Sequence, residues 1–134
     1  MFHQMKHAAI YAAGVGATVC LTLALAASPA LAQAPVKAAA GLLTDAAGMT
    51  LYVFDKDAAG SGKSVCNGPC AGLWPALKAA DGAQAAGDYT IVTRDDGVKQ
   101  WAHKGRPLYL WVKDQKPGDK TGDNVNNIWH VIAQ

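Results

Sequence analysis

The chain has 134 residues, 51% of them hydrophobic, with 12 basic and 10 acidic residues and a formal net charge of +2. So small a charge argues against nucleic acid as a partner, because phosphate binding depends on a clustered surplus of Lys and Arg. All 10 acidic residues are aspartate and 14 residues are glycine, a composition that favours turns and short strands over long helices.

The first 32 residues have the composition of a secretory signal. Lys6 gives a basic start, residues 8–27 carry no charge, and residues 30–32 (Ala-Leu-Ala) supply the small-x-small pattern of a cleavage site. We predict cleavage between Ala32 and Gln33 and an extracytoplasmic protein, periplasmic or secreted, that meets the membrane only through this signal. The uncharged run is near the ~20 residues that span a bilayer, so a retained anchor is the alternative.

Removing 32 of the 134 residues leaves 102, the size of one ordinary domain. We expect residues 33–40 to be a flexible leader and residues 41–134 to form a single domain. Short apolar runs alternate there with turn signals, which is typical of an antiparallel β protein. The predicted strands are residues 42–44, 49–54, 89–94, 99–103, 107–112 and 128–132.

One short helical turn is predicted between the second and third of these strands. Asn67 would cap it, Pro69 would lie near its first turn, and residues 70–74 would form its body before Pro75 ends it. No other segment after the signal has a convincing helical period.

Two stretches of the chain resemble each other closely. GMTLYVFDKD at residues 48–57 and GRPLYLWVKD at residues 105–114 share five identities in ten positions after a shift of 57 residues. Each copy leads through a polar loop to a tryptophan, Trp74 in the first and Trp129 in the second. Two copies are too few for a solenoid. We therefore predict an all-β sandwich or open barrel of two duplicated halves, residues 41–78 and 98–134, with pseudo-two-fold symmetry.

The motif Tyr-x-aromatic-x-x-Asp occurs in both stretches, at residues 52–57 and 109–114. With CNGPCAGLWPAL after the first copy and NNIWHVI after the second, it resembles the secreted repeats of unknown function found in predicted bacterial lipoproteins. The resemblance implies a small extracytoplasmic domain and discloses no activity. Val19 precedes Cys20 where lipid attachment needs a small residue, so this chain departs from the lipoprotein pattern.

The motif aromatics have two interpretations. Side chains alternate along a strand, so Tyr52 and Phe54 share one face and Tyr109 and Trp111 share the corresponding face of the second copy. Buried, these rings would dominate the core of so small a domain. Exposed, they would form a stacking platform for sugars or another flat ligand. We favour the core, because aromatic residues spaced two apart more often pack than bind.

The motif aspartates, Asp57 and Asp114, fall where each strand gives way to its loop. The simpler interpretation is a brace, in which a short carboxylate accepts hydrogen bonds from loop amides. The alternative is a small hydrolase in which the two carboxyl groups flank one bond, as in sugar hydrolysis.

Cys66 and Cys70 are the cysteines that remain after cleavage, and an oxidising compartment predicts a disulfide between them. The alternative is a redox or copper-handling protein, since two cysteines can hold copper when His or Met completes the shell. His103, His130 and Met49 are the available partners. We assign no metal and no cofactor.

The sequence contains none of the nucleophile, phosphate-binding or zinc-protease motifs that would indicate catalysis. Function is therefore predicted as an exported, non-enzymatic binding or structural module, whose partner is an unknown ligand or envelope component. The residues assigned to its framework are the motif positions Tyr52, Phe54, Asp57, Tyr109, Trp111 and Asp114, the tryptophans Trp74 and Trp129, and the disulfide Cys66–Cys70.

Overall fold

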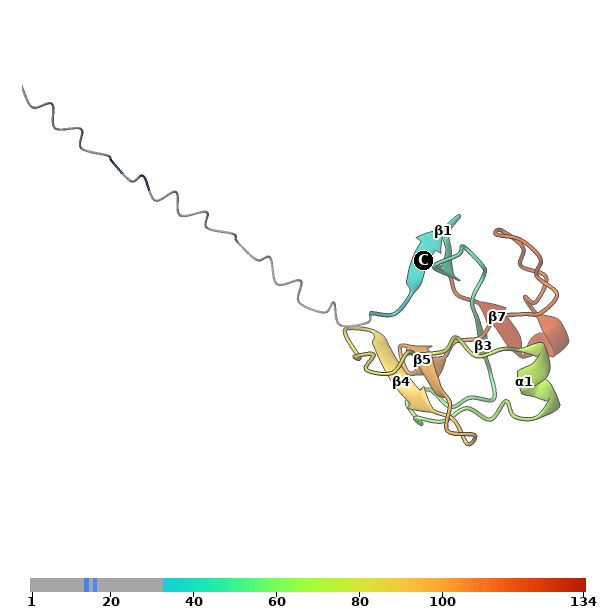
Figure 1. Ribbon diagram of the computed structural model, residues 1–134. Coiled ribbons are helices and arrows are strands. Elements are labelled where there is room, and N and C mark those ends of the chain that lie inside the picture. The colour runs from blue at the N-terminus through green and yellow to red at the C-terminus, as the bar shows by residue number, and fades with distance from the viewer. Residues whose placement is uncertain (1–13, 15, 17–32) are drawn as a thin grey trace, which may run out of the picture.

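The computed structural model describes residues 14, 16 and 33–134. The predicted signal therefore lies, apart from two glycines, outside the described residues. Within the described part no helix is long and apolar enough to cross a membrane. The elements, in chain order, are β1 (Val36–Ala39), β2 (Leu42–Asp45), β3 (Tyr52–Phe54), α1 (Pro69–Leu73), β4 (Tyr89–Thr93), β5 (Lys99–His103), β6 (Arg106–Pro107), the 3-10 turn η1 (Val125–Asn127) and β7 (Trp129–Val131) (Figure 1).

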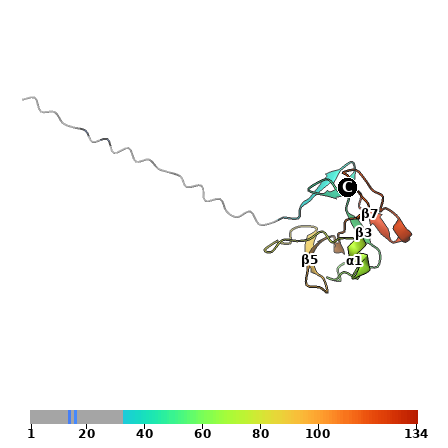
Figure 2. The same cartoon turned by 45° about the vertical axis from the view of Figure 1, so that its right-hand side comes forward.

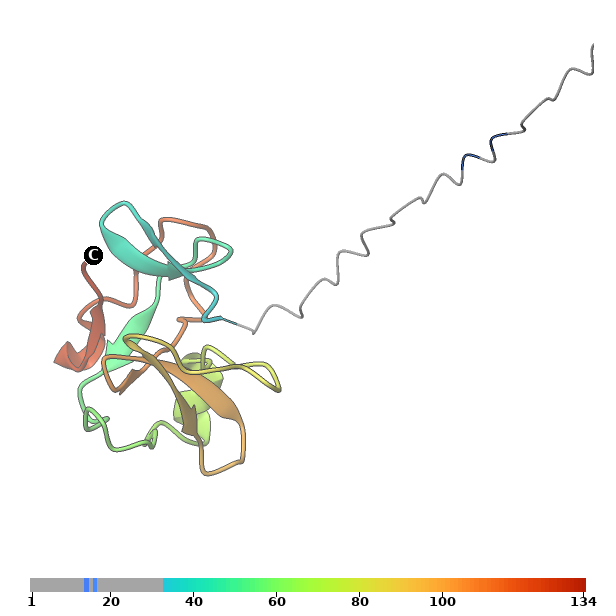
Figure 3. The same ribbon diagram turned by 90° about the vertical axis from the view of Figure 1, so that its left-hand side faces the viewer.

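The strands form small antiparallel sheets, so the β-rich fold expected from the turn-rich sequence is confirmed. β1 pairs with β2, β3 with β7, and β4, β5 and β6 follow one another in a three-stranded sheet. The β1–β2 hairpin and the β4–β5 sheet lie at opposite ends of the molecule, with β3 between them (Figures 2 and 3). α1 packs to one side, and the C-terminus returns to the β1–β2 hairpin, where the Gln134 N–H donates to the Gly41 carbonyl at 2.9 Å.

β3 is buried on both faces and divides the core in two. Its alternation sends Tyr52 and Phe54 into an aromatic cluster and Leu51 and Val53 into an aliphatic cluster. The aromatic cluster comprises Tyr52, Phe54, Cys66, Trp74, Tyr109, Trp111 and Trp129. The aliphatic cluster comprises Leu43, Leu51, Val53, Leu77, Trp101 and Leu108.

The second motif copy follows the same alternation but does not form the predicted strand 107–112. β6 ends at Pro107, and Tyr109 makes isolated bridges to Tyr52 on one side and to Ala76 on the other. The Leu110 N–H then donates to the carbonyl of Pro75. The segment is interrupted because its hydrogen-bond partners change within a few residues, so no ladder is long enough to count as a strand.

The structure places a strand within residues 33–40, the segment predicted to be a flexible leader. β1 lies inside it and pairs with β2 through the register Val36↔Asp45 to Ala39↔Leu42. The turn between them places Ala40 and Gly41 at φ values of 50° and 77°. Val36 also packs against the aliphatic cluster. This contact and the pairing with β2 hold in place a segment whose composition suggested no strand.

The predicted helical turn is confirmed as α1, with Pro69 at its first position. Gly68, not Asn67, is the capping residue, and no side chain caps the helix. Gly68 has a φ of 56°, a conformation that glycine adopts without strain.

Candidate functional site

Three of the four tryptophans and one motif phenylalanine form a column of stacked rings. Trp74 stacks on Trp129 at 3.8 Å and 4°, and on its other face meets Trp111 at 4.0 Å and 26°. Phe54 continues the column on Trp129 at 4.2 Å and 14°. None of these four side chains is more than 9% exposed. The motif aromatics therefore form the interior of the domain and offer no exposed stacking platform.

The motif tyrosines touch this column edge-on and are completely buried. Each donates its hydroxyl hydrogen to the aspartate of the other copy: Tyr52 to Asp114 at 2.6 Å, and Tyr109 to Asp57. The backbones of Tyr52 and Tyr109 also exchange N–H···O hydrogen bonds, at 2.8 and 2.9 Å. Such reciprocal contacts are those expected of two halves related by a pseudo-two-fold axis.

Each aspartate also holds the loop of its own copy. Asp57 accepts the Val65 N–H at 2.8 Å. Asp114 accepts both the N–H and the hydroxyl of Thr121, at 2.9 and 2.6 Å. Asp57 is 2% exposed and Asp114 is 8% exposed. The hydrolase interpretation needs two carboxylates facing an open cleft, whereas these are buried, already bonded, and turned toward separate loops.

The first copy carries a longer buried chain of hydrogen bonds than the second. Arg94, 4% exposed, donates to the Ser64 hydroxyl oxygen at 2.9 Å and also to the Cys66 carbonyl. Ser64 lies 2.5 Å from the Tyr109 hydroxyl, which itself donates to Asp57. Donors therefore run in one direction from the guanidinium to the carboxylate, so a buried positive and a buried negative charge are connected through two hydroxyl groups.

Burial sets the ionisation of these groups. It raises the pKa of Tyr52 and of Tyr109 above the ordinary value of 10.0, and the aspartate that accepts each hydroxyl raises the pKa further. Burial also raises the pKa of Asp57, against the lowering effect of the Tyr109 hydroxyl and the Val65 amide. Both tyrosines are therefore neutral hydrogen-bond donors at physiological pH.

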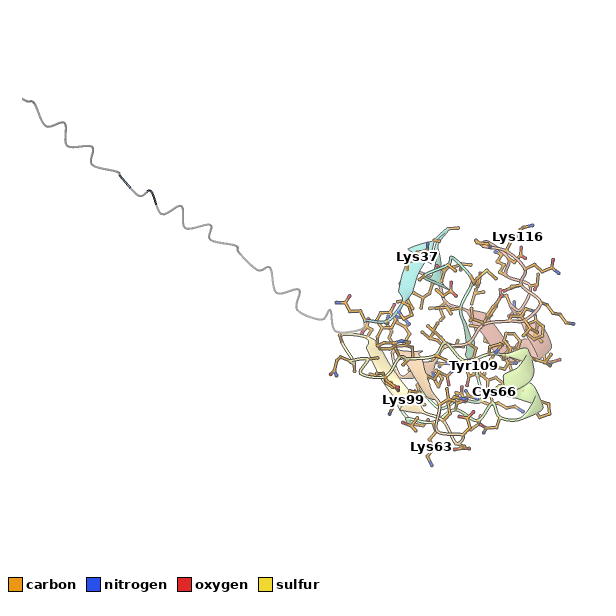
Figure 4. The ribbon with its side chains drawn as sticks, in the orientation of Figure 1. Lys37, Lys63, Cys66, Lys99, Tyr109 and Lys116 are labelled. Atoms are coloured by element: carbon orange, nitrogen blue, oxygen red, sulfur yellow. A yellow bond between two sulfur atoms is a disulfide. The ribbon has the colours of Figure 1, made fainter. Side chains whose placement is uncertain are left out.

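Cys66 and Cys70 form a disulfide, as the sequence predicted, with their Cα atoms 5.2 Å apart. Cys66 is fully buried in the aromatic cluster and Cys70 packs against that cluster. Figure 4 labels Cys66 and Tyr109, two members of the cluster. The bridge fixes the turn that leads into α1 and Trp74. Within residues 33–134 no group of three or more His, Cys, Asp or Glu side chains is placed to hold a metal ion.

His103 and His130, which the sequence offers together as possible copper partners, line one surface groove of about 390 Å³, which we call the histidine groove. One wall is formed by the β3–β7 sheet, where Val53 pairs with His130. His130 Nε2 lies 2.7 Å from Asp55 Oδ2. The other wall is the β5–β6 hairpin, with His103, Lys104 and Arg106.

The hairpin wall is held in place by a close backbone approach. The Gly60 N–H donates to the Gly105 carbonyl at 2.9 Å. A Cβ atom on Gly105 would lie 2.6 Å from the Gly60 nitrogen, and Gly105 has a φ of 80°. Only glycine satisfies both conditions, so the groove has a defined shape.

This fold defines a class of protein: a small β-rich domain in which two motif copies complete each other's hydrogen bonds inside one core. A family model described as a secreted repeat of unknown function matches the chain twice, at residues 35–78 and 90–133. The matches cover more than half of the chain, so the protein belongs to this family of secreted repeats. No curated protein and no solved structure matches the chain.

The matched segments extend the repeats predicted from the sequence. The first match begins at residue 35 and so includes β1, and the second begins at residue 90 and includes most of β4 and all of β5. The predicted halves, 41–78 and 98–134, include β5 but leave out β1 and β4.

Proposed function

We propose that the protein is an exported, non-enzymatic binding module whose repeated motif builds the fold and whose ligand binds at the surface. The observation that carries this proposal is the reciprocal bonding of Tyr52 to Asp114 and of Tyr109 to Asp57. The polar groups of the motif are satisfied by each other, so they stabilise the framework and leave recognition to the loops and grooves.

The histidine groove supports a binding role. It combines apolar lining residues with titratable side chains, the mixture that small-molecule sites use for affinity and orientation. Its two walls come from sheets that the core holds in fixed relation, since β3 and β6 are in direct contact. Export after cleavage at Ala32–Gln33 would place this groove in the periplasm or outside the cell.

The test is a ligand screen on the protein recovered after export. A thermal-shift panel of metal ions, sugars, haem, amines and carboxylates would be followed by NMR mapping of each hit. We expect hits to shift amide resonances around the groove. Tyr109→Phe should lower thermal stability without changing the dissociation constant of a hit, whereas a groove substitution should weaken binding. A hit whose binding requires the Asp57 carboxylate in a protein that remains folded would overturn the proposal.

Copper handling is the second candidate, and the pair Cys66–Cys70 is the observation that favours it. In the oxidised protein both sulfurs are bonded to each other and Cys66 is inaccessible, so the candidate concerns the reduced protein alone. Titration of reduced protein with Cu(I) decides it. Binding no tighter than that of the Cys66→Ser, Cys70→Ser variant would eliminate copper as the ligand.

A further inference from the structure

The charge lining the histidine groove is unbalanced. Lys104 and Arg106 are exposed on the hairpin wall, and neither appears in an ion pair among residues 33–134. Asp55 lines the groove as well, but its carboxylate lies against the imidazole of His130 at 2.7 Å. The two cationic side chains of the hairpin wall therefore outnumber the one carboxylate that lines the groove, that of Asp55, which is held by His130 on the opposite wall.

The remaining surface of the groove is apolar. Val53, Val131, Ile132 and Ala133 line it from β3, β7 and the end of the chain. A site for a bare inorganic ion needs no such apolar lining, because the ion gains nothing from displacing water there. Apolar lining residues beside cationic side chains complement a ligand with an anionic head and an apolar body.

The third group on the hairpin wall is a neutral hydrogen-bonding partner. His103 is 8% exposed and pairs with Arg106 across the β5–β6 ladder. Burial lowers the pKa of His103 and the neighbouring Lys104 lowers it further, against a smaller raising effect of the Asp88 carboxylate. At pH 7 the ring is neutral, so it offers one donor and one acceptor and adds no third charge to the wall.

We propose that the histidine groove binds a small organic carboxylate with an apolar body. The inference rests on the proposed function and names the ligand class of that same site. Arg106 would receive the carboxylate, since a guanidinium matches the geometry of two carboxylate oxygens, and Lys104 would add a second charge-assisted hydrogen bond. The apolar body would lie on Val53 and Ile132. A volume of about 390 Å³ suits a ligand at the small end of the drug-sized range.

The exported protein is titrated with hexanoate and benzoate, and binding is measured by calorimetry and by the shifts of the amide resonances of Lys104, His130 and Ile132. Three control ligands are titrated in the same way. Hexanol shows whether the ligand needs a charge, hexylammonium shows whether that charge must be negative, and acetate shows whether the ligand needs an apolar body. We expect hexanoate to bind about tenfold or more tighter than hexanol and acetate, from one charged hydrogen bond and one apolar contact.

Variants assign the interaction to the groove. Arg106→Ala should weaken hexanoate binding about tenfold or more, and Arg106→Glu should abolish it. Lys63→Ala removes an exposed lysine that lies outside the groove and should change nothing. The amide spectrum of each variant shows whether the fold is retained, and a folded Arg106→Ala protein with unchanged affinity overturns the proposal.

The outcomes separate this inference from the function on which it rests. Equal binding of hexanol, or tighter binding of hexylammonium, at the groove refutes the carboxylate and leaves the binding module standing. If no member of the wider panel shifts a groove resonance, both are refuted.

Discussion

The hydroxyl of Tyr109 is expected to contribute more to stability than that of any other tyrosine in the described chain. Tyr109→Phe keeps the ring against Trp129 and Phe54 but removes the hydrogen bond to Asp57. A buried carboxylate, 2% exposed, would then retain the Val65 amide as its donor. Leaving a buried charged acceptor short of a partner costs about 2–3 kcal/mol, equivalent to about 10–20 °C in Tm for a domain of this size.

Urea unfolding of the exported protein measures this cost, and Tyr89→Phe is the matched control. Tyr89 is half-buried against His103, so its substitution should change the unfolding free energy by less than about 0.5 kcal/mol. A cycle with Asp57→Asn should give a coupling energy of about 1–2 kcal/mol. If Tyr109→Phe proves as mild as the control and the coupling is zero, the cross-copy hydrogen bond does not stabilise the fold and our account of the motif is wrong.

Three further results are expected. First, the pKa values of both motif tyrosines are raised above 10.0, so their contribution to the unfolding free energy is intact below pH 10 and should fall by about 1.4 kcal/mol per pH unit for each tyrosine as the pH rises further. Urea titrations at stepped alkaline pH measure this slope. A double Tyr→Phe variant with the same slope would show that the two tyrosines are not its cause. Second, opening the Cys66–Cys70 loop by double substitution with alanine should cost about 2 kcal/mol from chain entropy, with an unchanged unfolding midpoint as the contrary result. Third, Gly122→Ala would place a Cβ 2.8–3.0 Å from three aromatic rings and should destabilise the protein by about 1–3 kcal/mol. The control is Gly72→Ala in α1, whose added Cβ meets nothing within 4 Å and should not destabilise the protein. Equal changes in Tm for the two variants would show that the aromatic cluster accommodates the extra methyl group without loss of stability.

Strand periodicity and turn chemistry located most of the β-rich fold from sequence. The alternation Leu-Tyr-Val-Phe gives β3 two apolar faces, for which burial of both was favoured over an exposed aromatic face, and in the structure both sets of side chains lie in core clusters. β1 was missed because Val36–Ala39 has little intrinsic preference for a strand and becomes one only by pairing with β2. Long-range pairing of that kind leaves no local signal.

The polar interior was less predictable than the apolar core. Arg94 precedes an Asp-Asp-Gly turn, a position that suggests a solvated side chain, yet it is buried because Ser64, Gln100 and the Cys66 carbonyl accept its hydrogens. Likewise, the motif contains a tyrosine and an aspartate five residues apart, but only the packed structure shows that the tyrosine of each copy binds the aspartate of the other copy. The sequence of a single repeat does not indicate this pairing.

Because Tyr52 bonds to Asp114 and Tyr109 to Asp57, we expect the pair of repeats, and not the single repeat, to be the smallest unit that folds. A single repeat would contain an aspartate without its tyrosine donor and only part of the column of stacked rings. Two such repeats supplied as separate chains should therefore assemble. By the same contacts two chains could exchange repeats, so strain in the segment between the repeats should favour a domain-swapped dimer.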